Sequence, residues 1–360
     1  LGIKVTLLTQ NAIDVPSEWF GENDLPNVYV IKGKRLPGGL IRKESFAGIA
    51  NLFDARTVLH LHVPWLLSNL QIAKLAKSNN IPYIITPHGS LDTWSMAQKS
   101  FKKLVYWKLF AHRLFMGSSS IHYTAEAERD QAEKYIKKQL VSIIPCLFDL
   151  TAYRKLPDKS IAIQKFNEID KVKPNVLFLS RLHPKKGVDV LIDAAKILIN
   201  NNIDINVLIA GPYDDSVKGY KETILSALSE KRISENIHFI GMVKGDEKLS
   251  LYQSADLFVL PTHQENFGLV LVEAMACEVP VLTSYGVDIW KELKAGGAII
   301  VENKAELVAE KIKLLFNDRL KLKELGEQAR GWVFNELDPN EIGKKYISMY
   351  NESLDKNSHE

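Results

Sequence analysis

Two glutamates, eight residues apart, lie in the segment of this sequence that is richest in reactive side chains. Glu265 is in a predicted loop after an apolar strand, and Glu273 is inside a predicted helix that begins near Leu269. Eight helical residues span about 12 Å, whereas the catalytic carboxylates of glycosidases stand roughly 5–9.5 Å apart. The spacing therefore favours two separate contacts with one elongated ligand over a single acid–base couple.

The turn between the two glutamates is suited to an anion. Gly268 allows the backbone to approach a ligand closely. The helix that follows directs free N–H groups and the positive end of its dipole at this turn, which makes a site for a negatively charged group. We therefore expect the phosphates of an elongated ligand to lie between Glu265 and Glu273.

Two cations occupy a second junction between a strand, a turn and a helix. Arg181 and Lys186 are five positions apart across this turn, and a helix begins after Gly187. An arginine suits a bidentate phosphate contact, and a lysine supplies a point charge. Gly211 ends the next strand in a similar way, and we expect it to form part of the rim of the same site.

The elements that position these residues follow one pattern from end to end, because short β-branched apolar runs alternate with helical patterns. This alternation predicts βαβ units and mostly parallel sheets. The predicted strands are 3–9, 28–31, 57–62, 82–86, 120–123, 141–144, 175–180, 205–210, 237–240, 256–260, 279–282 and 297–301. The predicted helices include 41–53, 66–79, 98–116, 125–138, 303–316, 318–334 and 339–353.

The length of 360 residues predicts two domains. We expect an N-terminal domain at 1–165, a C-terminal domain at 166–335, and a last helix at 336–360 that crosses back to the first domain, with a linker inside Asp149–Pro174. Ligands of doubly wound sheets bind beyond the carboxyl ends of the strands, so we expect a cleft between the domains.

Composition excludes several other classes of protein. The net charge of +3 is far below that of a dedicated nucleic-acid binder, so we expect no nucleic-acid partner. Cys146 and Cys277 are the only cysteines, which argues against a disulfide framework and favours the reducing cytosol. No clustered histidines accompany them, which argues against a zinc site. No stretch approaches the ~20 apolar residues that span a bilayer.

The motifs together resemble a known family. The order Ser-Arg-Leu-x-Pro-x-Lys-Gly at 180–187, Ala-Gly at 210–211 and Glu-x-Phe-Gly-x-x-x-x-Glu-Ala at 265–274 resembles the retaining glycosyltransferases of family 4, and the likeness covers about 175–335. The resemblance implies the GT-B fold, an α/β architecture of two doubly wound Rossmann-like domains facing a cleft. It also implies transfer of a hexose from a nucleoside diphosphate sugar to a hydroxyl of a glycan or lipid-linked acceptor, in surface polysaccharide synthesis.

The resemblance assigns a role to each matching residue. Arg181 and Lys186 would bind the donor diphosphate, Glu265 would bind the donor sugar, and Glu273 would bind the ribose hydroxyls. The backbone that would cradle the phosphates and the sugar belongs to Asn266, Phe267, Gly268 and Leu269. No cofactor and no metal are expected, because two cations can replace a divalent ion at a leaving diphosphate.

Each of these residues also has an ordinary structural explanation. A single arginine or lysine is usually a solvated surface charge, and Glu273 can be a satisfied buried carboxylate in an otherwise apolar helix. An isolated motif match carries a real risk of being accidental. The functional interpretation is favoured because all four charged residues fall at junctions between strands, loops and helices.

The N-terminal half contributes histidines. His88 follows a predicted strand in a Pro-His-Gly sequence, and the family commonly presents a histidine there to the donor sugar. A capping or packing histidine is the alternative. His60 and His62 alternate on one face of a strand, which favours hydrogen-bonded core residues, although His62 ends the strand and is also a candidate for the acceptor side.

Residues 99–113 combine Lys and Arg with aromatic and aliphatic side chains and contain no acidic residue. A basic aromatic helix can lie on an anionic membrane surface, and it can equally pack on the sheet with solvated lysines. The membrane interpretation would suit a polyprenol-linked acceptor. The protein would then be cytoplasmic and peripheral on the inner face of the cell membrane.

One departure from the family concerns the start of the chain. Family members have a strand and a Gly-rich loop before the segment that matches Leu1. We expect that the chain is a fragment, or that its N-terminal sheet has an edge or gap, so that strands 3–9 and 82–86 lose a shared neighbour.

Other functions remain open at this point. A GT-B-like nucleotide-sugar epimerase or a phosphorylase would share the fold, although the paired cations and paired glutamates argue against both. A non-catalytic nucleotide-sugar-binding or scaffold protein is the alternative outside the enzymes.

Overall fold

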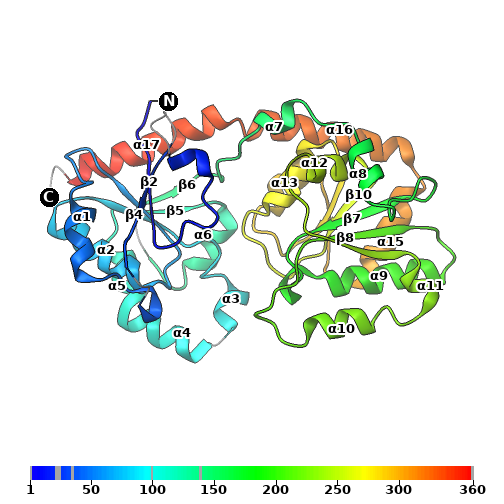
Figure 1. Ribbon diagram of the computed structural model, residues 1–360, viewed down its shortest axis with the longest axis horizontal. Helices are drawn as coiled ribbons and strands as arrows, with labels where there is room; N and C mark the ends of the chain where they lie inside the picture. The colour runs from blue at the N-terminus through cyan, green and yellow to red at the C-terminus, as the bar shows by residue number, and fades with distance from the viewer. Residues whose placement is uncertain (1, 21–25, 34–35, 99, 138–139, 358–360) are drawn as a thin grey trace. The chain divides into compact units, whose positions relative to one another are not determined.

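The computed structural model describes the whole chain except residues 1, 21–25, 34–35, 99, 138–139 and 358–360. The chain forms two compact units (Figure 1). The first unit consists of Leu1–Thr124, Glu128–Ile144 and Asn340–Glu360, and the second consists of Ala125–Ala127 and Pro145–Pro339.

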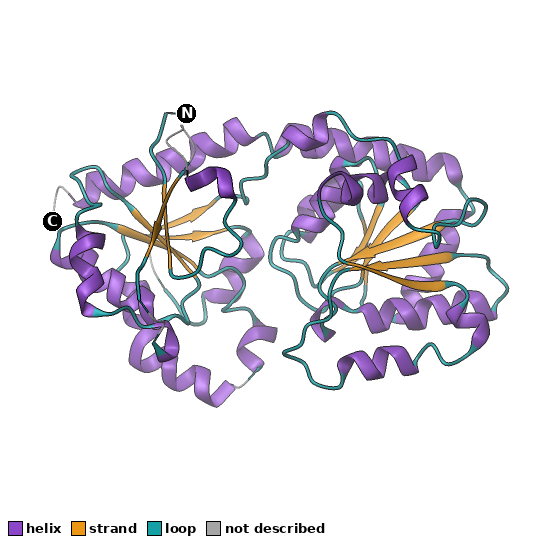
Figure 2. Cartoon of the chain, in the orientation of Figure 1, coloured by secondary structure: helices purple, strands orange, loops and turns teal. Residues whose placement is uncertain are grey.

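The second unit is built on one six-stranded parallel sheet with the strand order β12-β11-β10-β7-β8-β9 (Figure 2). The strands are β7 (Asn175–Leu179), β8 (Asn206–Ala210), β9 (Ile237–Gly241), β10 (Leu257–Leu260), β11 (Val281–Ser284) and β12 (Ile299–Val301). Their residues are mostly buried, as expected for nearly continuous apolar runs covered on both faces. The order reverses between the neighbours β7 and β10, which makes this the topological switch point of a doubly wound sheet.

Helices cover both faces of this sheet (Figure 1). On one face α9 packs against α15, and on the other α13 packs against α16 and α8 against α12. Buried Leu191, Ala194, Ala195 and Leu198 form one stripe of α9, with the spacing of an amphipathic helix. The helices of this unit are α7 (Thr151–Arg154), α8 (Ser160–Lys165), α9 (Val188–Asn200), α10 (Tyr220–Ser226), α11 (Lys231–Ser234), α12 (Gly245–Gln253), α13 (Leu269–Ala276), α14 (Trp290–Ala295), α15 (Ala305–Phe316) and α16 (Arg319–Glu336).

The described strands of the first unit form two separate parallel sheets. The pair β1-β2 stands apart from the four-stranded sheet of order β3-β4-β5-β6. The strands are β1 (Thr6–Thr9), β2 (Asn27–Val30), β3 (Leu59–His62), β4 (Tyr83–Thr86), β5 (Ser120–Tyr123) and β6 (Val141–Ile143). The expected break in the sheet is therefore present in the described part of this unit.

One detail of that expectation is wrong. We expected strand 82–86 to lose a neighbour, but β4 pairs with β3 on one side and β5 on the other. Strand β3 is instead the edge of the four-stranded sheet among the described residues. The reason is that the crossover through α2 brings the chain from β3 directly to β4, so that these two strands pair and β4 lies inside the sheet.

The helices of the first unit are short except for α2 and α17. They are α1 (Phe46–Ala50), α2 (Leu67–Ser78), α3 (Thr93–Ala97), α4 (Ser100–Tyr106), α5 (His112–Met116), α6 (Glu126–Ala132) and α17 (Pro339–Asn357), and a π-helical turn at Trp107–Ala111 joins α4 to α5. Ile342 and Met349 of α17 pack with Ile84 and Ile144. Residues 340–360 thus belong to the first unit.

The segment between the units differs from the predicted linker. Residues 149–174 contain α7 and α8, and Tyr153, Ala162 and Phe166 are buried in the core of the second unit. The division at residue 145 therefore comes earlier than the expected boundary at 165. These helices are too short to show a helical period in the sequence, so only scattered apolar residues indicated their burial.

Candidate functional site

The loops after β7 and β10 meet because these strands are neighbours at the switch point. Thr262 Oγ1 and the N–H of His263 both donate to the carbonyl oxygen of Lys185, each at 2.8 Å. Gly187 has φ of 70°, and a Cβ there would overlap the carbonyl oxygen of Pro261. Only glycine fits this close approach.

This contact brings Lys186 and Glu265 together as an ion pair. Their side chains are 12% and 17% exposed, so both charges are largely withdrawn from water. The backbone of Glu265 is fixed on both sides, because its N–H donates to the carbonyl of Gly286 at 2.8 Å and its carbonyl accepts from Asp288 N–H at 2.9 Å. A carboxylate in a loop is thereby held as firmly as one in a strand.

Gly268 ends this loop and is the N-cap of α13, with φ of 73°. A Cβ at this position would lie 2.8 Å from Leu271 Cδ1 and 3.1 Å from Glu265 Cγ. Phe267 is buried beneath the turn, and Leu269 at the start of the helix is exposed. The open start of α13 therefore lies beside the Lys186–Glu265 pair, where N–H groups favour an anion.

The side chain of Asn266 turns toward the loop after β11. Its Nδ2 donates to Asp288 Oδ2 at 3.1 Å, and its backbone N–H donates to Glu265 Oε1 at 3.2 Å. Three loops of the second unit, after β7, β10 and β11, thus meet at one residue, Glu265.

Arg181 has a different partner from Lys186. Its NH1 pairs with Asp214 Oδ2 at 2.8 Å, and the arginine side chain is 66% exposed. Hydrogen bonds from the side chain and backbone of Ser216 lower the pKa of Asp214, which keeps this carboxyl ionised. Gly211 brings the two loops into contact, because a Cβ there would overlap the carbonyl oxygen of Ser180. The loops after β7 and β8 thus hold Arg181, which pairs with Asp214, whereas among the described residues Lys186 is the ionic partner of Glu265.

Glu273 is directed from α13 toward α12. Its Oε1 pairs with Lys248 Nζ at 2.8 Å, and its Oε2 accepts from the hydroxyl of Tyr252 at 3.1 Å. Burial, together with the charge of Glu273, raises the pKa of Tyr252 well above its ordinary value, so this hydroxyl keeps its proton. Both oxygens of Glu273 therefore have a protein partner.

In the first unit, His88 follows β4 and lies beside His62 at the end of β3. His88 Nε2 is 2.8 Å from His62 Nδ1, and the two rings are stacked with centroids 5.1 Å apart. Partial desolvation of the rings and, for His62, the neighbouring His88 lower the pKa of both imidazoles, although each residue keeps an exposed surface. His62, which we weighed as a core residue or an acceptor-side residue, is exposed and contacts His88 directly.

His60 belongs to a separate chain of hydrogen bonds, as expected of a hydrogen-bonded core residue. Tyr350 OH contacts His60 Nδ1 at 2.9 Å, His60 Nε2 contacts Thr86 Oγ1 at 2.7 Å, and Thr86 Oγ1 contacts His122 Nδ1 at 2.8 Å. His122 Nε2 contacts the carbonyl oxygen of Ile144 at 2.8 Å. Burial lowers the pKa of His60 to about 2 and that of His122 to about 4, so both rings are neutral.

Sequence reasoning missed the partners of the predicted residues. Asp214 and Asp288 follow Gly211 and Gly286 just beyond the carboxyl ends of strands, which is a signal that a search for such acidic residues would have found. Lys248 lies in the middle of α12 and carries no comparable signal. Within the described residues, no group of three His, Cys, Asp or Glu side chains is arranged to hold a metal ion.

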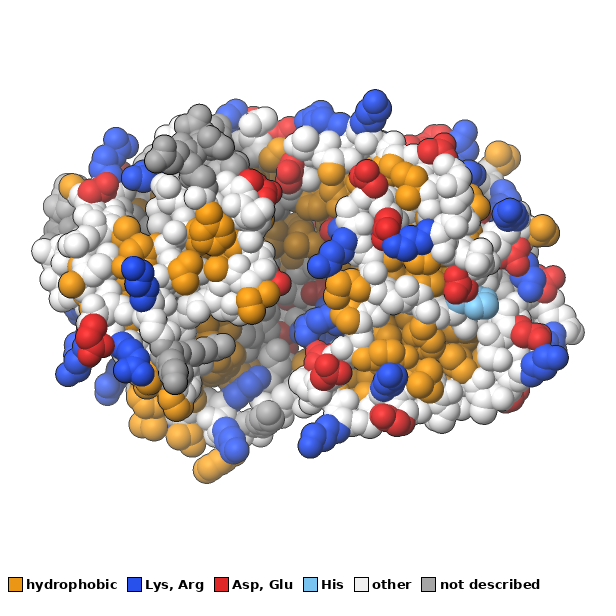
Figure 3. All heavy atoms as spheres, viewed as in Figure 1, with side chains coloured by type: hydrophobic (Ala, Val, Ile, Leu, Met, Phe, Trp, Pro, Cys, Tyr) orange, Lys and Arg blue, Asp and Glu red, His pale blue; other side chains and the backbone are white. Residues whose placement is uncertain are grey.

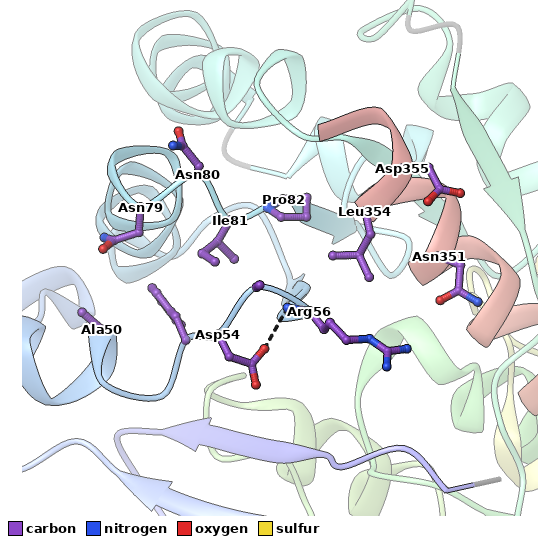
Figure 4. Close-up of a pocket in the computed structure, with 12 residues that line it drawn as sticks. Ala50, Asp54, Arg56, Asn79, Asn80, Ile81, Pro82, Asn351, Leu354 and Asp355 are labelled. Carbon is purple, nitrogen blue, oxygen red and sulfur yellow. Dashed lines mark hydrogen bonds between the residues drawn. The ribbon is translucent and has the colours of Figure 1, made fainter. Parts of the chain in front are cut away.

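A cavity of about 800 Å³ lies elsewhere in the first unit (Figure 4). Asp54, Arg56, Pro82 and Leu354 line it, and Asp54 Oδ1 accepts the backbone N–H of Arg56 at 2.9 Å. Asp54 and Arg56 precede β3 and Pro82 precedes β4, whereas His62 ends β3 and His88 follows β4. The cavity is therefore separate from the histidine pair.

Residues 159–332 match the family described as glycosyl transferases group 1. This segment is a group 1 glycosyltransferase domain. The match begins at α8 and ends within α16, so it contains all three loops that converge on Glu265. The chain is a glycosyltransferase.

Individual relatives extend the likeness to the first unit. The chain is 29% identical over 332 residues to D-inositol 3-phosphate glycosyltransferase of Nocardia farcinica, which covers 90% of this chain and 71% of that protein. It is 28% identical over 179 residues to the capsular polysaccharide biosynthesis glycosyltransferase CapM of Staphylococcus aureus, covering 49% and 46% of the two chains.

Solved structures of this architecture show the fold. Sucrose-phosphate synthase from Thermosynechococcus elongatus has a TM-score of 0.76 at 19% identity, covering 98% of this glycosyltransferase and 89% of that chain. Anabaena Alr3699/HepE in complex with UDP and glucose has a TM-score of 0.73 at 18% identity, covering 91% and 86%. The glycosyltransferase has the GT-B fold. Among its described helices, none combines the length and the apolar character that crossing a bilayer requires.

Proposed function

We propose that this glycosyltransferase moves a hexose from a nucleoside diphosphate sugar to a hydroxyl of a glycan or lipid-linked acceptor, with retention of the anomeric configuration, in surface polysaccharide synthesis. The observation that carries the proposal is the Lys186–Glu265 pair, withdrawn from water and lying beside the open start of α13. The name of CapM and the UDP and glucose in the HepE complex support a capsule-type product and a nucleotide-sugar donor.

The chemistry of the pair fits a leaving diphosphate. As the bond from the sugar to the diphosphate breaks, negative charge develops on the leaving phosphate. Lys186, Arg181 and the N–H groups at the start of α13 are the positive groups that would stabilise this charge. Because these groups already supply positive charge, we expect the reaction to need no metal and no further cofactor.

Glu265 has two tasks in this proposal. Without donor, it holds the ammonium group of Lys186 in place. With donor bound, the diphosphate pairs with Lys186 in place of Glu265, and the Glu265 carboxylate then accepts hydrogen bonds from hydroxyls of the sugar. The resemblance to family 4 supports attack from the face that the diphosphate leaves, with a phosphate oxygen taking the proton of the acceptor. Gly211 and Asn266–Leu269 would shape the rim and the cradle, Glu273 would bind the ribose, and His88 the donor sugar.

The direct test is a donor screen. UDP-, GDP- and ADP-sugars are added to the protein, thermal stabilisation is measured, and the stabilising donor is then assayed for transfer. A donor present at 100 times its Kd should stabilise the protein by about 2.7 kcal/mol. Lys186→Ala should weaken binding by roughly 10- to 100-fold, since a hydrogen bond to a charged group contributes about 1.5–3 kcal/mol.

Lys196→Ala is the matched control, because Lys196 also pairs with an acidic residue of the second unit, Asp193, but lies within α9 away from the loops. Its donor binding should stay at the wild-type value. If Lys186→Ala binds donor as tightly as Lys196→Ala, the diphosphate assignment is wrong. Released inorganic phosphate, or isomerised sugar without acceptor, would instead indicate a phosphorylase or an epimerase.

We further propose that residues 99–113 bind an anionic membrane surface at the inner face of the cell membrane, where a polyprenol-linked acceptor would be reached. Lys99 lies outside the described residues. Phe101 and Leu109 are 78% and 55% exposed, with Lys108 exposed beside them. Figure 3 shows hydrophobic side chains gathered over α4 with basic side chains near them.

Vesicle sedimentation tests this surface. The protein should bind vesicles that contain phosphatidylglycerol and not vesicles of phosphatidylcholine alone, because the basic groups add electrostatic attraction to apolar insertion. Phe101→Ser with Leu109→Ser should abolish binding. Leu320→Ser, which removes an equally exposed apolar side chain from the second unit, should not. Equal losses in both variants would contradict the proposal.

A further inference from the structure

The backbone of His88 is held in a conformation that residues with side chains rarely adopt, with φ of 50°. A buried carboxylate fixes it. The N–H of Gly89 donates to Glu128 Oε1 at 2.7 Å, and Glu128 Oε2 accepts from the N–H of Thr124 at 2.8 Å. The position of the His88 backbone is therefore determined by α6 and β5, independently of its ring.

The loop that carries His62 is fixed in a similar way by a different side chain. Val63 has φ of 63°, which is unusual for a β-branched residue. Asn69 Nδ2 donates to the carbonyl oxygens of both His62 and Val63 at 2.8 Å. Such conformations persist only where the surroundings impose them, and they are frequent at functional sites. Two strained loops thus face each other across the His62–His88 hydrogen bond.

The protonation of the pair follows from this hydrogen bond. A hydrogen bond between two ring nitrogens 2.8 Å apart needs one nitrogen that carries a hydrogen and one that does not, so with both rings neutral a single hydrogen lies between His62 Nδ1 and His88 Nε2. A neutral imidazole has one donor and one acceptor nitrogen. Hence, whichever ring donates, the two outer nitrogens, His62 Nε2 and His88 Nδ1, are always one donor and one acceptor. In the described part of the chain, neither of these outer nitrogens has a hydrogen-bond partner.

We propose that His62 is a positioning residue that orients the ring of His88, and that the two outer nitrogens together bind neighbouring hydroxyl groups of a sugar. A hydroxyl both donates and accepts, so two adjacent hydroxyls complement one donor and one acceptor. A fully ionised phosphate only accepts hydrogen bonds, so it would bind only the donor nitrogen of the two. The identity of the sugar as the donor hexose rests on the proposed function, whereas the coupling of the two rings does not.

Nuclear magnetic resonance of the full chain labelled with ¹⁵N-histidine tests the coupling without any substrate. In the wild type at pH 7.5, the signals of His62 and His88 should be those of neutral rings with one shared hydrogen bond. In His62→Leu, His88 should shift toward the tautomer mixture of a free imidazole. His62→Asn should restore the wild-type pattern, because the amide group of asparagine can reach the position of Nδ1.

His112→Asn is the control, since His112 is exposed on α5 and makes no hydrogen bond to the pair. It should leave the His88 signals in place. If the signals and titration of His88 are the same in His62→Leu as in the wild type, the proposal is overturned. If His62→Leu unfolds, the signals of all histidines will change. In that case His62→Asn tests the proposal, because its His88 signals should match those of the wild type.

The activity arm uses the donor found in the thermal screen. With a neutral hydrogen bond contributing about 0.5–1.5 kcal/mol, kcat/KM should fall about two- to tenfold in His62→Leu and recover in His62→Asn. If the rings are coupled but kcat/KM is unchanged, His62 does not act through His88 on the sugar. Failure of the donor screen itself would contradict the proposed function and not this coupling.

Discussion

The two units hold their polar groups by different means. In the second unit, glycines allow loops to touch through their backbones, and an ion pair, Lys186–Glu265, lies where three loops meet. In the first unit, a chain of hydrogen bonds runs through His60, Thr86 and His122, and a separate hydrogen bond joins His62 to His88. The first arrangement depends on space and charge, and the second depends on the position of protons.

The direction of every hydrogen bond in the longer chain can be worked out. The carbonyl of Ile144 only accepts, so His122 Nε2 carries the hydrogen, and its Nδ1 must accept from Thr86. The Thr86 oxygen then accepts from His60 Nε2, which leaves His60 Nδ1 to accept from Tyr350. The chain has a single consistent arrangement as long as both histidines are neutral. Protonation of either histidine would therefore disrupt this chain of hydrogen bonds. The second unit should instead be most sensitive to an added side-chain atom at the glycines where its loops touch.

An added methyl group should have the largest effect. Gly187→Ala forces a Cβ into the carbonyl of Pro261 at a left-handed φ, and we expect a loss of about 3 kcal/mol or more in the free energy of unfolding. Gly219→Ala is the control, because Gly219 has φ of 79° and open space around its missing Cβ. It should cost only about 1 kcal/mol. Urea unfolding measures both, and equal losses would show that the close approach does not matter.

Acid should have the next largest effect, and it should act on the first unit. The pKa values of His60 and His122 are lowered in the folded state, so the unfolded chain binds more protons below pH 6.5. Stability is complete above that pH and falls as the pH drops toward 4, with a slope of up to about 1.4 kcal/mol per pH unit for each histidine.

Urea unfolding between pH 8 and pH 4.5 checks the slope, and imidazole ¹⁵N shifts check its source. The His60 and His122 rings should remain neutral in the folded protein at pH 5, because their pKa values are about 2 and about 4. Titration of either ring near pH 6.5, or a stability that does not change over this range, would contradict the explanation.

Removing the central hydroxyl should cost less. Thr86→Val preserves the shape of the side chain but leaves His60 Nε2–H without an acceptor and His122 Nδ1 without a donor. We expect a loss of about 2–3 kcal/mol, since each unsatisfied buried group costs about 1–3 kcal/mol. Thr57→Val, at an exposed hydroxyl of the same unit, should cost less than 1 kcal/mol. If the two variants lose equal stability, the chain adds nothing to the first unit.

The same contrast explains what the sequence predicted and what it did not. The six strands of the second unit were all expected, because buried parallel strands are short apolar runs. The positions of Lys186 and Glu265 at strand ends were also expected. Their pairing was not, because the two residues are 79 positions apart and meet only through the strand order β10-β7. Arg181 is grouped with Lys186 by spacing and by the family resemblance, although its ionic partner lies in the loop after β8.

In the first unit, the histidines were visible but their partners were not. The alternation of His60 and His62 placed them on one face, yet it could not indicate that one would bond to Thr86 and the other to His88. Hydrogen-bond partners of a ring depend on distances of a few tenths of an ångström, which no periodicity encodes. The role of α17 was equally hidden, because Tyr350 lies 290 positions from His60.

The smallest expected effect comes from the far end of the chain of hydrogen bonds. Tyr350→Phe removes the donor to His60 Nδ1 but leaves the ring that packs near it. Because the orphaned nitrogen is an acceptor in a partly buried place, we expect a loss of about 1 kcal/mol. Tyr135→Phe, whose hydroxyl makes no hydrogen bond to the described residues, should change stability by less than 0.5 kcal/mol, a typical value for a neutral surface change. A Tyr350→Phe variant as stable as Tyr135→Phe would mean that α17 is held to β3 by apolar packing alone.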